Sequence, residues 1–241
     1  MNIFLNWSSG KDAAFSFLEL LHNGQKPGLL VTTVNEHHRR VSMHGVDRRL
    51  LQLQARRMNI PLHEIALPGT VDLATYDKIM LAHAEKLKHQ GFDTAAFGDI
   101  FLEDLKQYRI RQMDQVGMKC IFPLWGRDTD ILAREIIRSG IKAVVVAVDA
   151  KRLDKDFAGR TFDEQFLADL PEGVDACGEN GEFHTFVYDA PFFDAPVAFR
   201  YHGVVFRSYG NCEDEKNSLN QAEPKKWNTG FWFAHLSPVN G

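Results

Sequence analysis

Strand and helix signals alternate along residues 1–150, and few folds are compatible with that order. The alternation predicts a parallel sheet with crossover helices, and therefore an α/β fold with a doubly wound parallel sheet. The run "KAVVVAVDA", residues 142–150, is continuous and β-branched, as expected for a strand of that sheet covered on both faces. The predicted strands are residues 2–7, 29–34, 62–67, 94–97, 120–122 and 142–150, and the predicted helices are residues 13–21, 47–58, 71–88, 102–116 and 130–138.

The alternation ends after residue 150. Residues 163–170 have the pattern of a short helix, and residues 186–188, 197–201 and 204–207 have the pattern of strands, with His202-Gly203 as a hairpin turn. A polar stretch, "NCEDEKNSLNQAEPKK", precedes a final strand in "GFWFAHL". Residues 151–241 are therefore expected to form a smaller, mixed α+β domain with antiparallel strands.

The composition argues against nucleic acids and anionic membranes as partners that the protein binds through its overall charge. The chain has 241 residues and a formal net charge of -4 at pH 7, which provides no overall attraction to nucleic acid or to anionic membranes. No apolar run approaches the roughly 20 residues of a membrane span, and the first strand signal leaves no room for a signal peptide. Three cysteines without a C-x-x-C pair indicate free thiols in a reducing compartment, so we expect a cytoplasmic protein.

The stretch "NWSSGKDAAF" joins the first strand to the first helix through a short polar turn. Such a turn points backbone N–H groups outward at the positive end of the helix dipole, where an anion binds well. The turn is too short for a Walker P-loop, whose G-x-x-x-x-G-K-[ST] pattern is absent. Its candidate phosphate ligands are Ser8, Ser9, Gly10, Lys11 and Asp12, and the alternative is that Ser8, Ser9 or Asp12 only caps the helix.

Two further segments follow strand ends of the predicted sheet. Ligands bind at the carboxyl ends of parallel strands, so segments that follow different strands converge there. Val34, His44 and Gly45 lie at or after the end of the second strand, and Gly98 and Asp99 follow the fourth. We therefore expect these residues and the 8–12 turn to line one cleft.

Several motifs of the chain occur in one known family. The turn "SSGKDA" resembles the PP-loop, S-G-G-x-D-S, which holds the pyrophosphate half of ATP in enzymes that cut between the α- and β-phosphates. Five further motifs follow in the family's order: "VSMHGV", "FGDIFLEDLKQYR", "FPLW", "GRTFDEQFLADLP" and "CGENGEFHTFVYDAPFF". Together they resemble the diphthine–ammonia ligase family of N-type ATP pyrophosphatases over nearly the whole chain, most weakly at residues 211–227. The resemblance implies a HUP-like PP-loop ATPase domain over residues 1–150 and a substrate-binding domain over residues 151–241.

The resemblance also implies an ATP-dependent amide ligase. In that reaction ATP adenylates a carboxylate, pyrophosphate leaves, and ammonia or an amine attacks the acyl-adenylate to release AMP. The backbone of the turn and the charge of Lys11 would hold the leaving pyrophosphate, with adenine near Val34 and His44. Asp12 and Asp99 would hold a Mg²⁺ ion that bridges phosphate oxygens. The expected partners are ATP, ammonia or an amine, and a carboxylate acceptor, either a small molecule or a modified protein side chain.

The late loop "CGENGEFHT" supplies the remaining candidates for catalysis. Glu179 and Glu182 flank a flexible Asn-Gly pair, so both carboxylates can face one cavity, where they would orient ammonia, accept its proton or bind metal. The alternative is a solvated acidic turn. Arg109 and Arg160 are candidates for binding phosphate or the substrate carboxylate, or for structural ion pairs. Cys177 fits a small loop residue better than a nucleophile, because no partner base is evident nearby.

Four positions depart from the family's pattern. Ser9 replaces a glycine and narrows the backbone freedom of the turn, while Ala13 replaces a serine and removes a hydroxyl that could reach phosphate. Asn180 and His184 differ from the glycine and the acidic residue of the E-G-G-E-Y-E form. These departures bear on the identity of the acceptor more than on ATP binding.

Two other functions stay open. One is a PP-loop enzyme that activates an RNA base for sulfur or amine transfer, although the chain has neither a C-x-x-C pair nor an added basic RNA domain. The other is a non-catalytic module that binds adenine nucleotide for regulation, an alternative that the loss of a hydroxyl at Ala13 keeps open. Nucleic acid and membrane are not expected as partners, and a homodimer is left open.

Overall fold

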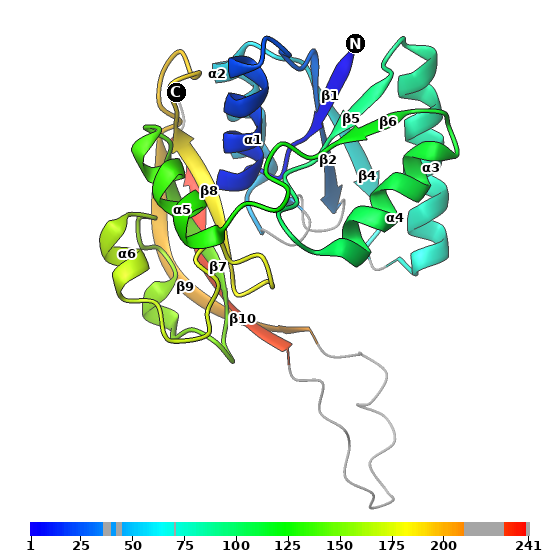
Figure 1. Ribbon diagram of the computed structural model, residues 1–241. Helices are drawn as coiled ribbons and strands as arrows, with labels where there is room; N and C mark the ends of the chain where they lie inside the picture. The colour runs from blue at the N-terminus through cyan, green and yellow to red at the C-terminus, as the bar shows by residue number, and fades with distance from the viewer. Residues whose placement is uncertain (36–39, 42–44, 70, 210–228, 240–241) are drawn as a thin grey trace, which may run out of the picture.

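Five parallel strands form the first of two sheets (Figure 1). The computed structural model describes residues 1–35, 40–41, 45–69, 71–209 and 229–239. The short β3 (Arg40–Val41), which the sequence pattern did not predict, pairs antiparallel with the end of β2. The parallel strands pair in the spatial order β4-β2-β1-β5-β6. Their bounds are β1 (Ile3–Asn6), β2 (Leu29–Asn35), β4 (Leu62–Leu67), β5 (Thr94–Ala96) and β6 (Lys119–Ile121).

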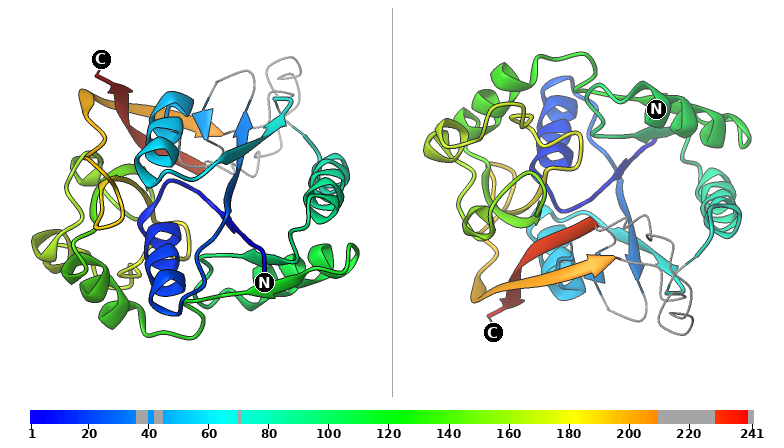
Figure 2. Two further views of the ribbon diagram at one scale, coloured as in Figure 1. Left: turned by 90° about the horizontal axis from the view of Figure 1, so that it is seen from above. Right: turned by 90° about the horizontal axis from the view of Figure 1, so that it is seen from below.

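Helices cover both faces of this sheet (Figure 2). Ile3 and Leu5 of β1 share a core with α1 and α2, whereas Phe4 between them shares a second core with α3 and α4. This split follows from the strand geometry, because successive side chains point to opposite faces. The predicted doubly wound parallel sheet is therefore confirmed. The helices are α1 (Lys11–His22), α2 (Arg48–Met58), α3 (Leu73–His89) and α4 (Glu103–Asp114).

Aspartate caps begin four of the helices. In each, the carboxylate accepts a backbone N–H from two or three residues further along, which satisfies one of the donors left open at a helix start. The capping residues are Asp47 for α2, Asp72 for α3, Asp128 for α5 (Thr129–Arg138) and Asp163 for α6 (Glu164–Ala168). The start of α1 differs, because its cap is Gly10, which makes no side-chain hydrogen bond. None of the helices in the described part of the chain is both long and apolar enough to cross a membrane.

The second sheet is antiparallel, in the order β8-β7-β10-β9. One of the sequence expectations is wrong here, because β7 (Lys142–Asp149), the run "KAVVVAVDA", belongs to this sheet and not to the parallel one. The strand is buried on both faces as expected, within a core that the antiparallel sheet shares with α1 and α2. A continuous run of hydrophobic residues indicates that a strand is buried, but it does not indicate which of the two sheets the strand joins. The other strands are β8 (Phe183–Asp189), β9 (Phe199–Tyr209) and β10 (Thr229–Pro238).

The predicted hairpin turn at His202-Gly203 is also wrong. Both residues lie inside the long strand β9, which pairs with β10 along its length. The register between the two strands shifts beside them, and Gly203 has a φ of 93°. The glycine therefore serves a β-bulge, which like a tight turn needs a residue that tolerates positive φ.

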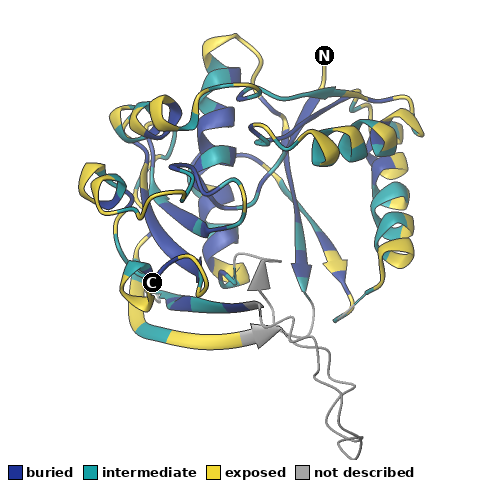
Figure 3. Ribbon diagram, turned by 60° about the horizontal axis from the view of Figure 1, so that its bottom comes forward, coloured by how far each residue is buried: buried dark blue, intermediate teal, exposed yellow. Residues whose placement is uncertain are grey.

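Helix α1 lies at the centre of the molecule (Figure 3). Seven of its twelve residues are buried, because the parallel sheet covers one side of the helix and the second sheet another. Strands β1 and β5 are neighbours in the sheet, but the chain leaves them toward opposite edges. The crevice at the carboxyl ends of two such strands is where α/β sheets of this kind bind ligands, and the turn that begins α1 lies there.

Replacing Phe166 of α6 by alanine is expected to destabilise the fold strongly. The Phe166 ring is fully buried and lies 5.1 Å from the Phe183 ring of β8, between centroids. Loss of a buried phenylalanine usually costs about 3–5 kcal/mol in the free energy of unfolding, measurable by urea denaturation. The exposed Ile131 provides a control, whose replacement by alanine should change that free energy by less than about 0.5 kcal/mol. A loss below about 1 kcal/mol for Phe166→Ala would contradict this packing.

Candidate functional site

A cleft of about 570 Å³ opens at the carboxyl ends of β1 and β5. Both halves of the chain line it, since residues of the 8–12 turn face residues of the loop that precedes β8. The structure therefore brings these two loops together at one cleft. Among the predicted site residues, those that line the cleft are Ser8, Lys11, Asp12, Gly98, Asp99, Arg109 and Glu179.

The turn has an unusual backbone at Ser9, whose φ is 74°. This left-handed conformation is the one for which glycine is the usual residue, as in the family pattern. Ser9 is fully buried, and its hydroxyl has no hydrogen-bond partner within the described residues. The side-chain caps considered for α1 are not what the structure shows: Gly10 is the cap residue, and Thr185 of β8 accepts the N–H of Lys11 at 3.0 Å. The start of α1 is thus completed by the second sheet.

Lys11 is buried beneath this turn. Its Nζ donates to both carboxylate oxygens of Asp12, at 2.9 and 3.0 Å, and to the backbone carbonyl of Cys177. The rings of Phe162 and Phe183 lie 5.3 and 5.2 Å from the ammonium, a distance suited to cation–π attraction. Burial opposes the charge, but the Asp12 carboxylate raises the pKa of Lys11 above its ordinary value. Lys11 therefore remains charged and joins the turn to the late loop, while its contact with pyrophosphate stays a prediction.

The end of β5 contributes an ion pair and a close backbone contact. Asp99 pairs with Arg109 of α4 at 3.3 Å, and the Arg109 guanidinium lies 4.8 Å from the centre of the Phe97 ring. A side chain at Gly98 would place its Cβ 3.2 Å from the backbone of α1, a contact tight enough that the backbone would have to shift by a few tenths of an ångström. Asp12 and Asp99 therefore lie on either side of that contact, at one edge of the cleft.

Glu179 reaches across the cleft to the first half of the chain. Its Oε1 accepts the backbone N–H of Ile100 at 2.8 Å. Burial, with a further contribution from the negative charges of Asp12 and Asp99, raises the pKa of Glu179 to about 7. A carboxylate with a pKa near neutrality can both hold and release a proton at physiological pH, as a general base or acid must.

Glu182 has a different environment from Glu179. It is buried, it is not among the residues that line the cleft, and its Oε1 accepts the backbone N–H of Asp175 at 3.2 Å. The side-chain amide of Asn180 also donates to that oxygen, at 3.1 Å, whereas Oε2 has no partner in the described residues. Glu182 therefore holds the shape of the loop, and a direct catalytic role for it stays a prediction.

The segment after β2 provides less of the cleft than expected. Val34 is buried within the sheet and does not line the cleft. Gly45 packs against the Phe233 ring of β10, which a Cβ at that position would approach to 2.8 Å. His44 lies outside the described residues. Thr32 and Thr33, in the middle of β2, line the cleft instead.

The other two candidates have structural environments. Arg160 pairs with Asp169 at 2.6 Å and is not part of the cleft lining. Burial raises the pKa of the Cys177 thiol far above its ordinary value, so the thiol stays protonated and is a poor nucleophile.

Metal binding by the protein alone has little support from the geometry. Among the described residues, no group of three or more histidine, cysteine, aspartate or glutamate side chains is placed to hold a metal ion. Asp12 and Asp99 each lie beside a cation of the protein. A metal ion at this edge would therefore need ligands from a bound molecule.

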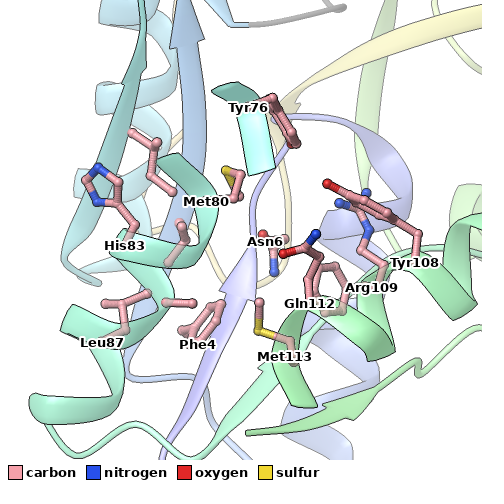
Figure 4. A pocket seen from close by; sticks show the side chains of 14 residues that line it. Phe4, Asn6, Tyr76, Met80, His83, Leu87, Tyr108, Arg109, Gln112 and Met113 are labelled. Atoms are coloured by element: carbon pink, nitrogen blue, oxygen red, sulfur yellow. The ribbon is translucent and has the colours of Figure 1, made fainter. Parts of the chain in front are cut away.

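A second cavity lies between the parallel sheet and helices α3 and α4 (Figure 4). Phe4, Met80 and Met113 give it a largely apolar wall, and Asn6 and Arg109 belong to both this cavity and the cleft. Its volume is about 30 Å³, enough for about one or two water molecules and too small for a nucleotide base. A nucleotide therefore does not fit in this cavity, whereas the larger cleft has room for one.

Comparisons with known proteins find a matching family and several similar proteins. Residues 128–217 match the model of a family described as the diphthamide synthase C-terminal domain. A human protein named diphthine–ammonia ligase is 27% identical over 229 residues, which cover 83% of this chain and 84% of that protein. A protein of the same name from Danio rerio is 28% identical over 214 residues, which cover 79% and 83%. The predicted resemblance to the diphthine–ammonia ligases is confirmed.

The family match begins before β7 and continues through β8 and into β9. The crystal structure of a predicted subunit of a tRNA methyltransferase from Methanocaldococcus jannaschii also aligns, over 79% of this chain and 98% of that one, at 15% identity. Its TM-score of 0.41 is too low to carry an argument about fold or function.

Glu179→Gln is expected to change how stability depends on pH. With a pKa raised from 4.5 to about 7, the folded chain retains a proton that the unfolded chain releases in this range. The contribution of Glu179 to the free energy of unfolding therefore falls as the pH rises from about 4.5 to about 7. Glutamine does not titrate but keeps the acceptor for Ile100, so the variant should lose this fall.

The measurement is the free energy of unfolding in urea at several pH values between about 4.5 and 8. The exposed Glu172 lies in the same segment, and Glu172→Gln should keep the wild-type pH dependence. Identical pH dependence in the wild type and Glu179→Gln would show that the Glu179 carboxyl is not perturbed in the folded chain.

Proposed function

We propose that this protein is an ATP-dependent ligase that adenylates a carboxylate and joins it to ammonia or an amine, releasing AMP and pyrophosphate. The observation that carries the proposal is the shared cleft, where the turn at the start of α1 faces the loop that carries Glu179. Acyl transfer needs the carboxylate within about 3–3.5 Å of the α-phosphorus, so the nucleotide and the acceptor must meet in one cleft. The names of the relatives support the same reaction class.

The turn would hold the phosphates of ATP. Its backbone N–H groups lie at the positive end of the α1 dipole, which favours negative charge as pyrophosphate leaves. Arg109 lines the same cleft and adds a guanidinium suited to phosphate oxygens. In this proposal residues 1–150 bind the nucleotide, and residues 151–241 present the acceptor.

Glu179 is the proposed base. An amine beside carboxylates is held as ammonium, which has no free electron pair and cannot attack until it loses a proton. With a pKa raised to about 7, Glu179 can take that proton, after which the amine attacks the acyl-adenylate carbonyl and AMP leaves. Glu182 would act indirectly, by holding the loop in the conformation that brings Glu179 to the cleft.

Asp12 and Asp99 fit a Mg²⁺ ion that arrives with the nucleotide. Both carboxylates line the cleft, and their hard oxygen atoms suit this ion, which commonly takes one or two carboxylates and completes its shell with phosphate oxygens and water. When bound, the ion would neutralise charge on the phosphates. Each aspartate also pairs with a cation of the protein, Lys11 or Arg109, so nucleotide binding would have to rearrange at least one of these pairs.

Diphthine is the acceptor that the names of the relatives suggest for this chain. Asn180 and His184 depart from the family loop, so a different carboxylate is the second possibility for the same chemistry. A cytoplasmic location and a homodimer also remain predictions.

The products of turnover test the proposed reaction. Incubation with ATP, Mg²⁺, ammonium and a diphthine-bearing protein should release AMP and pyrophosphate in equal amounts, with one amide formed per AMP. Glu179→Gln should lower amide formation by about 10²- to 10⁴-fold while ATP binding is retained, because only the base is lost. Glu172→Gln is again the control and should turn over like the wild type.

Other results would exclude the proposal or part of it. Release of ADP and phosphate would show that the turn has been misinterpreted. ATP binding without turnover on diphthine or on small carboxylates would favour the non-catalytic module that Ala13 left open. Wild-type amide formation by Glu179→Gln would remove the proposed base.

A further inference from the structure

The side-chain amide of Gln54 makes three hydrogen bonds in the interior, beside the turn. Gln54 lies on α2 and is fully buried. Its Oε1 accepts the indole N–H of Trp7 at 2.8 Å, and its Nε2 donates to the carbonyls of Ser9 and Val187 at 3.1 and 2.7 Å. One amide therefore connects α2, the turn before α1 and strand β8.

The chemistry of its three partners determines the orientation of this amide. The Trp7 indole can only donate, whereas the carbonyls of Ser9 and Val187 can only accept. The amide oxygen must therefore face Trp7 and the amide nitrogen must face the two carbonyls, as the structure has them. Few side chains could replace it, because the position needs one acceptor and two donors.

The carbonyl that Gln54 holds belongs to the strained residue of the turn. Ser9 has a φ of 74°, and its carbonyl accepts a second hydrogen bond, from the backbone N–H of Val187 at 2.9 Å. Non-glycine residues adopt this backbone conformation only when their surroundings over-determine it. The Ser9 carbonyl accepts one hydrogen bond from Gln54 of α2 and one from Val187 of β8, and these two bonds hold Ser9 in this conformation.

We infer that Gln54 is a positioning residue for the nucleotide site, holding Ser9 in the left-handed conformation that directs the N–H groups of the turn toward phosphate. This inference rests on the proposed function, because it assumes that the turn binds the phosphates of ATP. Gln54 does not line the cleft, so it acts only through the backbone that it binds. The serine at position 9 makes this contact necessary, because a glycine would adopt the same conformation without strain.

The test compares Gln54→Met with a matched variant of the same helix. Gln52 also lies on α2, but its amide donates to Glu64 at 2.7 Å, away from the turn, so Gln52→Met is the control. Methionine keeps the length of the side chain and removes the amide. Calorimetry with ATP and Mg²⁺ should give a Kd at least about tenfold higher for Gln54→Met, and a Kd within about twofold of the wild type for Gln52→Met.

Glycine at position 9 tests whether Gln54 positions the turn or only contributes to the stability of the fold. Adding Ser9→Gly to Gln54→Met should restore most of the affinity, because glycine needs no constraint to keep the turn in place. If Gln54 contributed only to packing, Ser9→Gly would leave the affinity low. Wild-type affinity in a folded Gln54→Met chain, or no recovery in the double variant, would overturn the inference.

Amide hydrogen exchange provides a measurement that needs no nucleotide. Peptides covering residues 6–15 should exchange faster in Gln54→Met than in Gln52→Met, and adding Ser9→Gly should slow that exchange again. If the wild type binds no ATP, the proposed function fails, and the exchange rates still decide whether Gln54 holds the turn. Equal exchange in the two single variants would overturn the inference.

A second variant applies if Gln54→Met does not fold. Trp7→Phe keeps an aromatic ring at this buried position and removes the indole N–H that orients the amide, together with the five-membered ring that carries it. Weaker ATP binding that Ser9→Gly restores is the expected result. A folded Trp7→Phe chain with wild-type affinity and wild-type exchange in residues 6–15 would overturn the inference.

Discussion

The buried ammonium of Lys11 is the interaction that joins the two halves of the molecule at the site. A charge in the interior is tolerated only with close partners, and here they come from both halves: Asp12 from α1, and the Cys177 carbonyl and the rings of Phe162 and Phe183 from the later half. Removing one partner of such a pair typically costs about 3–5 kcal/mol. If the late loop moved away from the start of α1, the Lys11 ammonium would lose its bond to the Cys177 carbonyl. The cleft therefore depends on the contact between Lys11 and the late loop.

The charged side chains that line the cleft limit which ligands it can bind. Asp12, Asp99 and Glu179 bring three carboxyl groups close to the place proposed for phosphates. Among the described residues that line the cleft, the lysine and arginine charges that oppose them are those of Lys11 and Arg109. Burial is the main cause of the raised pKa of Glu179, and repulsion from Asp12 and Asp99 raises it further. A divalent cation bound with the nucleotide would relieve this repulsion, which makes the proposed ligase chemistry consistent with this charge distribution.

The departures from the family pattern have structural counterparts in this chain. Ser9 stands where the family pattern has glycine and adopts a positive φ, which favours glycine, while α2 and β8 hold its carbonyl. Asn180 donates to Glu182 and so stabilises the loop from within. Ala13 gains no such counterpart, but the Thr185 hydroxyl accepts the Lys11 N–H at the start of the same helix.

The sequence by itself determined the helices, most of the strands, the polar turn after the first strand and the glycine-rich loop, because periodicity and turn chemistry are local properties. It also indicated that Asp12 and Asp99 would line one cleft, since the ends of parallel strands converge. Only the tertiary structure decided that β7 joins the antiparallel sheet, that Glu179 and not Glu182 faces the cleft, and that Gln54 holds the turn. These outcomes depend on strand pairing and on burial between segments far apart in the chain, and no local pattern of residues encodes either one.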